Sequence, residues 1–235
     1  MGRSRSGPAN DAMSDGLALV FARSSKAWST TPLPWRATRS TLPEVKTLLE
    51  GVTVGGHRLE DERQVLNQAA SWKALLSLVE RGNFELNRAT FCELHALVAQ
   101  EEALEWGTFR TGAVTVAGTN FEPPRWQSLA SIFEAGLGAL ARIGDLHERA
   151  IALFLFGALN QFFYDGNKRT SRLMMNGILL GAGEDAISVP ARRRLEFNEA
   201  MIRFYDSQDG TEMMRFMAGC SLDPQLRIGV EEGAR

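Results

Sequence analysis

Residues 147–172 read HERAIALFLFGALNQFFYDGNKRTSR, and this stretch decides the fold class. Its first part, residues 147–161, is apolar nearly all round, which is typical of a helix buried at the centre of a protein. A polar loop that contains a glycine follows at once, and a further apolar helix is expected from near Leu173. Because the start of a helix attracts anions, a loop that leads into one predicts a binding site.

The segments on either side also carry helical patterns. Apolar residues recur every three or four positions, and capping residues or glycines stand at the ends of the periodic segments. Residues 106–124 break this pattern, because a β-branched stretch lies there between two glycines. We therefore predict an all-α helical bundle with a flap that is a small β-hairpin or simply extended. The predicted flanking helices cover residues 41–50, 65–79, 87–98, 125–142 and 195–205, and a last one opens at Thr211.

The composition is that of an ordinary globular protein. The chain has 235 residues, of which 44% are hydrophobic and 23% charged, so one domain is the default. The formal net charge of −2 gives no basic excess of the kind that binds nucleic acid. Cys92 and Cys220 lie far apart and indicate neither a disulfide framework nor a zinc site. No apolar run is long enough to span a membrane, so we expect a cytoplasmic protein.

The chain divides into three parts. Residues 1–40 are rich in Ser, Arg, Thr and Pro and show no sustained periodicity, which is typical of a flexible arm. Residues 41–220 carry the helical patterns and form the predicted domain. Residues 221–235 are left as a C-terminal tail.

The polar loop contains the groups that bind a polyphosphate. Gly166 and Asn167 tolerate positive φ, so their backbone N–H groups can turn inward as an anion-binding nest. Lys168, Arg169 and Arg172 supply positive charge. The two arginines lie three residues apart, so they share one face of the following helix and can both address phosphates.

Asp165 directly precedes this nest. Its carboxylate is a hard oxygen ligand of the kind that Mg²⁺ uses when it bridges phosphates. Taken alone, the loop also fits the solvated start of a helix, with Asp165 as a cap and ordinary surface arginines. The buried helix before the loop and the flap upstream favour a phosphate site.

These residues resemble the signature of the Fic family, His-x-Phe-x-(Asp/Glu)-Gly-Asn-(Gly/Lys)-Arg-x-x-Arg. Residues 110–116 and 121–124 are similar to the flap segment of that family, which lies alongside the target peptide. Leu49-Glu50-Gly51 resembles the motif of an inhibitory helix, (Ser/Thr)-x-x-x-Glu-(Gly/Asn), although Lys46 stands where that motif has Ser or Thr. The signature is matched by Phe163, Asp165, Gly166, Asn167, Lys168, Arg169 and Arg172.

The resemblance implies a Fic-type helical bundle and a set of roles. Fic enzymes transfer AMP, or less often another phosphate-linked group, from a nucleotide such as ATP to a Ser, Thr or Tyr hydroxyl of a target protein. Asp165 would hold Mg²⁺, and Glu50 would pair with Arg172 and so keep the enzyme off. Thr115 and Val116 of the flap would lie along the target. The nucleotide would be bound by Gly166, Asn167, Lys168, Arg169 and Arg172.

The resemblance also implies a departure at the catalytic base. Gln161 stands where the motif has its histidine. A neutral imidazole, with a pKa of about 6.5, accepts a proton near neutral pH, whereas an amide does not. General base catalysis contributes roughly 10²–10⁴-fold, so we expect ordinary AMP transfer to be weak or absent. We predict structural roles for the three histidines of the chain, His57, His95 and His147.

Three functions remain open. The first is atypical nucleotide-dependent modification of protein hydroxyls. The second is a catalytically inactive module whose interactions with other proteins respond to a bound nucleotide. The third is removal of a modification, with Glu50 activating water. The retained motif residues favour functions that keep nucleotide binding. We expect Mg²⁺ and ATP as ligands, a target protein as partner, no nucleic acid and no membrane; the target and the oligomeric state are left open.

Overall fold

A computed structural model of the chain describes residues 59–221. Within that range the regular structure is helical and no strand is formed, so the all-α prediction is confirmed. The predicted N-terminal arm, the helix 41–50 with Glu50, and the C-terminal tail lie outside the described residues, apart from residue 221. The helices are α3 (Leu59–Glu80), α4 (Arg88–Val98), η1 (Trp126–Ser128), α5 (Leu129–Leu140), α6 (Leu146–Asn160), α7 (Asn167–Gly181), η2 (Ala191–Arg193), α8 (Arg194–Ser207) and α9 (Thr211–Ser221).

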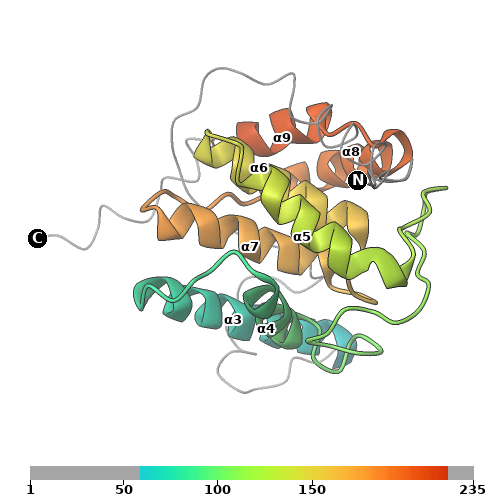
Figure 1. Cartoon of the computed structure of the whole chain (residues 1–235), viewed down its shortest axis with the longest axis horizontal. Coiled ribbons are helices and arrows are strands. Elements are labelled where there is room, and N and C mark those ends of the chain that lie inside the picture. Colours follow the sequence, from blue (N-terminus) through green and yellow to red (C-terminus); the bar gives the residue numbers. More distant parts are fainter. Residues whose placement is uncertain (1–58, 222–235) are drawn as a thin grey trace, which may run out of the picture.

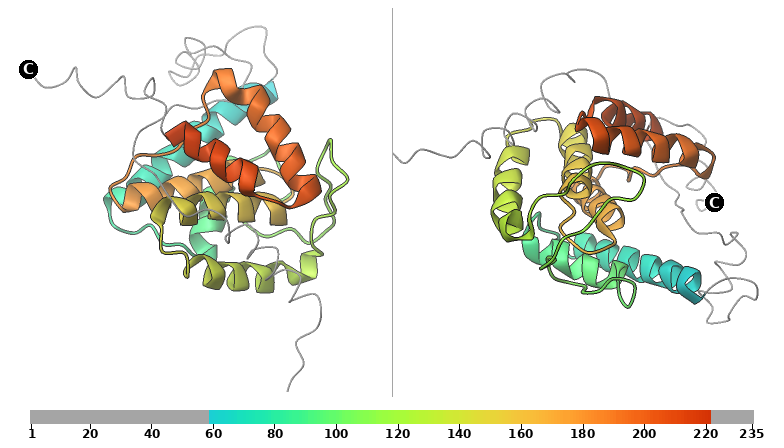
Figure 2. Two further views of the ribbon diagram at one scale, coloured as in Figure 1. Left: turned by 90° about the horizontal axis from the view of Figure 1, so that it is seen from above. Right: turned by 90° about the vertical axis from the view of Figure 1, so that its right-hand side faces the viewer.

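Helices α6 and α7 form the centre of the bundle (Figure 1). Helices α8 and α9 pack on one side of this pair, while α3, α4 and α5 pack on the other (Figure 2). Two apolar clusters fill the spaces, and α6 and α7 contribute to both of them. This arrangement explains why α6 is apolar all round, since burial on several sides stabilises a helix that has no polar face.

The sequence pattern predicts the start of α7 too far along the chain. Helix α7 begins at Asn167, more than one turn before the expected start near Leu173. Gly166 is its N-cap, with a φ of 74°. The apolar periodicity reveals only the later turns, because the first turn of α7 carries polar residues that face a pocket rather than the core.

Residues 106–124 form the extended flap and not the β-hairpin. The described residues contain no strand pairing there, and one backbone–backbone turn bond, from the Thr119 N–H to the Val116 carbonyl at 3.3 Å, lies within the flap beside several side-chain bonds. The flap runs along the right-hand edge of the bundle in Figure 1, beside the turn that joins α6 to α7. Its shape therefore depends on contacts with the rest of the bundle.

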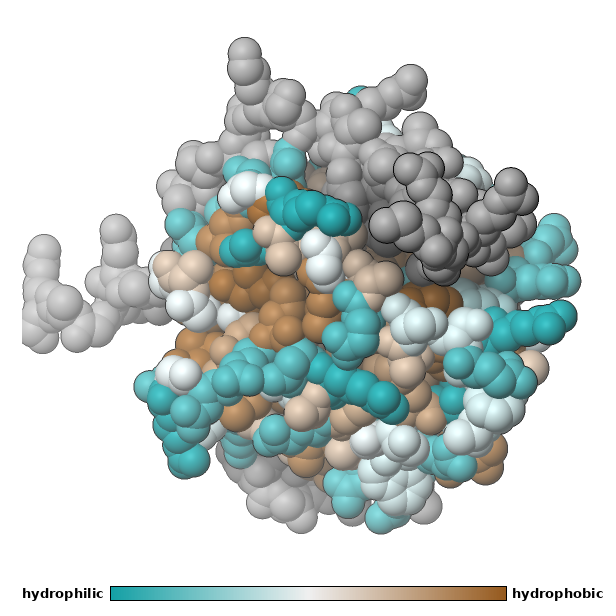
Figure 3. Space-filling view, in the orientation of Figure 1, coloured by the Kyte–Doolittle hydropathy of each residue, from teal (hydrophilic) through white to brown (hydrophobic). Residues whose placement is uncertain are grey.

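The surface seen from the same direction mixes hydrophilic and hydrophobic side chains (Figure 3). An apolar area gathers on the left, away from the turn between α6 and α7 (Figures 1 and 3). Between residues 59 and 221, no helix combines the length and the apolar content that crossing a bilayer requires.

Gly157 lies where α6 and α7 approach each other closely. A Cβ atom at this position would collide with the side chain of Ser171 on α7, whereas a Cβ at Gly138 of α5 would meet nothing within 4 Å. Both glycines are inside helices, so both alanine variants gain similar helix propensity. We expect Gly157→Ala to be less stable than Gly138→Ala by about 1–3 kcal/mol, as measured by urea unfolding. Equal stabilities of the two variants would contradict the close packing.

Candidate functional site

The motif loop, residues 161–166, begins at a residue with left-handed backbone geometry. Gln161 has φ 47° and ψ 58°, and its side chain bridges the two central helices. Its Oε1 accepts a hydrogen bond from Asn167 Nδ2 at 3.0 Å, and its Nε2 donates to the Ala158 carbonyl at 2.6 Å. Nε2 also lies 3.4 Å from the hydroxyl of Tyr205. Both ends of the amide are therefore engaged.

Asn167 closes the loop with its side chain. Its Oδ1 accepts the N–H of Phe163 at 2.9 Å, and its Nδ2 donates to the Phe163 carbonyl at 2.8 Å. The positive φ that we allowed for Asn167 is not found, because this residue is the first of α7 and Gly166 makes the turn instead. Asn167 thus acts on the loop through its amide side chain.

His95 supports the loop from behind. The Gly107 N–H donates to Nδ1 at 3.0 Å, so Nε2 carries the proton and donates to the Asp165 carbonyl at 2.9 Å. The ring is fully buried and stacks on Phe163, with centroids 3.6 Å apart and planes at 5°. Burial lowers the pKa of His95 to about 4, so the ring is neutral at pH 7. The structural role predicted for His95 is confirmed.

Gly166 allows the loop to approach α4. A Cβ atom there would lie 3.2 Å from Val98 Cγ1 and 3.3 Å from Ala99 Cβ, and the positive φ also favours glycine. The Gly166 N–H donates to Asp165 Oδ1 at 2.6 Å. No side chain from residues 59–221 caps the start of α7, so the N–H groups of its first turn can receive an anion.

A pocket of about 230 Å³, here called the cationic pocket, opens over this helix start. Four of its lining residues are basic and one is acidic. Such a balance, together with the helix start, favours an anionic ligand such as a phosphate chain. The lining consists of Gln64, Asp165, Lys168, Arg169, Arg172, Val189, Arg194, Phe197 and Asn198.

Arg169 is already neutralised by a carboxylate. Its Nη1 forms an ion pair with Glu102 Oε2 at 2.8 Å and lies 3.2 Å from the Val98 carbonyl. Glu102 is in turn held by Asn67 Nδ2 at 2.8 Å. Arg169 therefore lines the cationic pocket with a charge that is largely compensated.

Arg172 has no such partner in the described part of the chain. Its guanidinium lies 5.8 Å from the centre of the Phe197 ring, and none of the ion pairs within residues 59–221 includes it. Burial, followed by the neighbouring Arg169, lowers the pKa of Arg172 to about 10. Within the described residues, this partly buried cation is thus left without a carboxylate partner.

The side chain of Asp165 points its free oxygen toward solvent at the rim of this pocket. It is 63% exposed, and its Oδ2 has only a 3.5 Å approach to Arg169 Nη2. Within residues 59–221, no three His, Cys, Asp or Glu side chains gather as a metal cage. One carboxylate fits Mg²⁺ when ligand phosphates and water supply the other oxygens.

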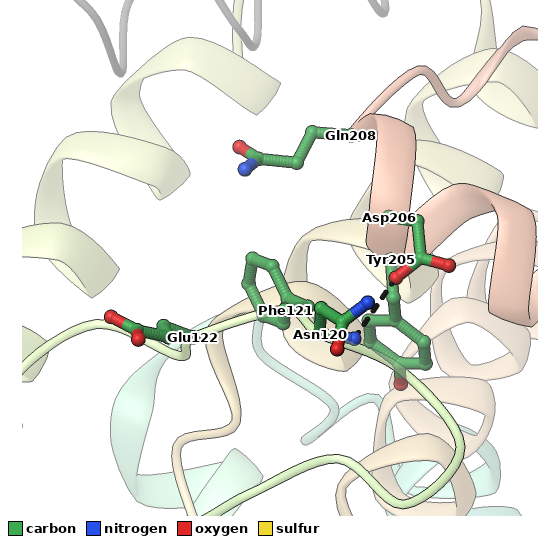
Figure 4. Close-up of a pocket in the computed structure, with 6 residues that line it drawn as sticks. All are labelled: Asn120, Phe121, Glu122, Tyr205, Asp206 and Gln208. Atoms are coloured by element: carbon green, nitrogen blue, oxygen red, sulfur yellow. Dashed lines mark hydrogen bonds between the residues drawn. The ribbon is translucent and has the colours of Figure 1, made fainter.

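A second pocket of about 490 Å³ lies between the flap and the end of α8 (Figure 4). The Asn120 N–H donates to Asp206 Oδ1 at 3.2 Å, and the rings of Phe121 and Tyr205 lie 5.7 Å apart. None of the described residues that line this pocket is basic, so these residues disfavour phosphates there. It is lined by Asn120, Phe121, Glu122, Tyr205, Asp206 and Gln208.

The two pockets lie along one face of α8. Asn198 lines the first and Tyr205 the second, and seven residues separate them, which is roughly 10 Å along the axis. The predicted flap residues Thr115 and Val116 line neither pocket; Thr115 is exposed, and Val116 packs against the core between α6 and α9.

Comparison with known proteins shows what this chain is similar to. Residues 85–179, which contain the motif loop, match the Fic/DOC family. The protein adenylyltransferase Fic of Drosophila erecta is 28% identical over 189 residues, covering 77% of this chain and 37% of the relative. The one of Drosophila persimilis is 29% identical and covers 77% and 36%. The chain thus spans little more than a third of these curated relatives.

Solved structures share the fold of this chain. Fic-1 from C. elegans superposes with a TM-score of 0.68 at 21% identity, covering 78% of this chain and 56% of that one. A Fic family protein from Desulfovibrio desulfuricans G20 gives 0.65 at 16% identity, covering 94% and 74%.

The structure brings the predicted motif residues together and adds others that the sequence did not reveal. His95, Glu102 and Arg110 all contact the motif residues from positions far away in the chain. No spacing rule connects them to the motif, since their partners lie 51 to 70 residues away. Glu50 lies outside the described residues, so its pairing with Arg172 stays a prediction.

Proposed function

We propose that this Fic domain binds Mg·ATP or a related nucleotide and transfers its nucleotidyl group, weakly or from an atypical donor, to Ser, Thr or Tyr hydroxyls of a target protein. The observation that carries the proposal is Arg172, a partly buried cation without a carboxylate partner in the described chain, beside the uncapped start of α7. The names of the curated relatives, protein adenylyltransferases, also support it.

In this proposal the phosphates occupy the cationic pocket. Arg172 and the first-turn N–H groups of α7 bind them, while Lys168 and Arg194 add charge at the rim. Asp165 would hold Mg²⁺, which neutralises phosphate charge when bound. The second pocket, which has no cation, is left to the uncharged parts of the reactants.

The transfer step lacks a strong base. The acceptor oxygen forms a bond to the α-phosphorus, the bond to the pyrophosphate oxygen breaks, and pyrophosphate leaves with the bonding electrons. The hydroxyl proton then passes to water or buffer, because the Gln161 amide does not accept it near pH 7. His95 cannot replace the base, since its two nitrogens are occupied by Gly107 and the Asp165 carbonyl. Positioning and charge would remain as the sources of catalysis.

One observation favours the alternative of a nucleotide-responsive interaction module. The Gln161 amide is engaged at both ends and connects α6 to α7, which gives this side chain a structural explanation that needs no chemistry. In that case nucleotide binding would be retained and label transfer would be absent.

Calorimetric titration of Mg·ATP tests the binding step. We expect the wild type to bind, Glu50→Gly to bind more tightly, and Arg172→Met to lose about tenfold or more in affinity, because a charge-assisted phosphate contact is removed. Arg142→Met, which removes an exposed arginine at the end of α5, is the matched control and should bind like the wild type.

The outcomes separate the assignments. Absence of binding in both the wild type and Glu50→Gly would reject a nucleotide function. Equal affinities of these two proteins would reject Glu50 as an inhibitor of Arg172. If ATP binds, α- and γ-labelled ATP then distinguish transfer of AMP, transfer of phosphate, and binding without transfer.

A further inference from the structure

Arg110 is a buried cation that no carboxylate neutralises within residues 59–221. It is only 2% exposed, and its hydrogen bonds all go to main-chain carbonyls. Desolvation lowers its pKa from the usual range of arginine. Because a buried charge is tolerated only when it is fully hydrogen-bonded, these carbonyls are what retain the guanidinium at this place.

Two of the three carbonyls belong to the flap and the third belongs to the motif loop. Nε donates to Gln161 at 2.6 Å, Nη1 to Gly112 at 2.7 Å, and Nη2 to Pro124 at 2.5 Å. Gly112 lies two residues after Arg110 within the flap, Pro124 is the last residue of the flap, and Gln161 begins the motif loop. The Arg110 N–H adds a bond to the Phe162 carbonyl at 2.9 Å. One planar side chain thus joins two parts of the flap to each other and to the motif loop.

Apolar packing also holds the flap, through the buried ring of Phe109 and through Val116 and Phe121, which pack against the core. The polar contacts of its middle part with the bundle are longer than those of Arg110. Thr111 Oγ1 lies 3.3 Å from the Tyr164 hydroxyl, and the Asn120 N–H lies 3.2 Å from Asp206 Oδ1. The described flap contains no strand ladder that would hold its shape from within. The bonds of Arg110 are shorter than these contacts and carry a full charge, which roughly doubles the strength of a hydrogen bond.

We propose that Arg110 is a positioning residue, which sets the flap against the motif loop and leaves the phosphate site alone. None of its bonds reaches a residue that lines the cationic pocket, whereas the flap supplies Asn120, Phe121 and Glu122 to the second pocket. The flap would thereby place the uncharged parts of the reactants, and this last step rests on the proposed function.

Amide hydrogen exchange of the full chain, followed residue by residue by NMR, tests the proposal. In Arg110→Met, the amides of Thr119, Asn120 and Phe121 should exchange about tenfold or more faster, while amides inside α6 keep their wild-type rates. Arg110→Lys should act in the same direction, because an ammonium cannot reproduce the planar fork. Arg125→Met, which removes an exposed arginine next to Pro124, is the control and should leave the flap unchanged.

A phosphate-only probe completes the test. The affinity for Mg·tripolyphosphate, measured by calorimetry, should stay within about twofold of wild type in both Arg110 variants, a difference of less than half a kcal/mol. Wild-type flap exchange in a folded Arg110 variant would overturn the proposal, and so would equal acceleration throughout α6, which would indicate general destabilisation. If Arg110→Met does not fold, Arg110→Lys decides. Failure of all proteins to bind tripolyphosphate would reject the proposed function, while the exchange rates would still decide the role of Arg110.

Discussion

Gln161→His is expected to raise the transfer of label from α-labelled ATP to protein by roughly 10²–10⁴-fold over the wild type. An imidazole with a pKa of about 6.5 can take the hydroxyl proton that the amide leaves to solvent. The loop should tolerate the change, because Asn167 keeps its two bonds to the Phe163 backbone when the bond to Gln161 is lost. The gain corresponds to about 3–5 kcal/mol of transition-state stabilisation.

Gln161→Asn is the matched control for this experiment, since it keeps an amide and supplies no base. Label incorporation should be measured in the wild-type and Glu50→Gly backgrounds, with Mg·ATP affinity determined for each protein. A histidine variant that binds Mg·ATP like the wild type and yet transfers label no faster than Gln161→Asn would contradict the proposed transferase. The interaction module would then be the better description.

The free energy of unfolding is expected to fall by about 2 kcal/mol between pH 7 and pH 5 because of the titration of His95 in the unfolded state. The pKa of this ring is about 4 in the folded chain, against about 6.5 in the unfolded chain, because burial disfavours the charged form. The unfolded state therefore takes up a proton in this window while the folded state does not. The stability contributed by His95 is complete above pH 6.5 and is lost as the pH falls toward 4.

Two variants isolate this effect in urea unfolding at the two pH values. His95→Gln can accept from the Gly107 N–H and donate to the Asp165 carbonyl without titrating. His95→Phe also does not titrate and keeps an aromatic ring against Phe163, but it leaves both buried polar groups unpaired, at a cost of about 1–3 kcal/mol each. Both variants should lose about 2 kcal/mol less than the wild type between pH 7 and pH 5. A decline in His95→Gln that parallels the wild type would contradict the buried neutral ring.

Local sequence patterns predict the helices of this domain well and the contacts of its site poorly. The all-apolar stretch of α6 indicates a central helix, and Asn87 caps α4 as expected, with its side chain accepting the Thr90 N–H. The start of α7 and the missing hairpin were mispredicted, because polar first turns and unpaired extended segments leave no periodic signal. A helix that points polar residues into a pocket looks like a loop in sequence.

The residues of the motif loop were predicted from resemblance, but what supports them was not. Arg169 was expected to bind phosphate, and the structure ties it to Glu102, an acid from the loop after α4. The His95 bond to the Asp165 carbonyl joins residues 70 positions apart. Such contacts depend on how the helices pack, and no rule of spacing within one segment contains that information.

The hydrogen bonds that hold the backbone of the motif loop make its shape independent of which side chain stands at its first position. The backbone is held at Gln161 by Arg110, at Phe163 by Asn167, and at Asp165 by His95. None of these three bonds uses the side chain at position 161. One scaffold can therefore carry either an amide or an imidazole at this position. A change between a catalyst and a protein that binds nucleotides without catalysis would then require a single residue exchange and no change of fold.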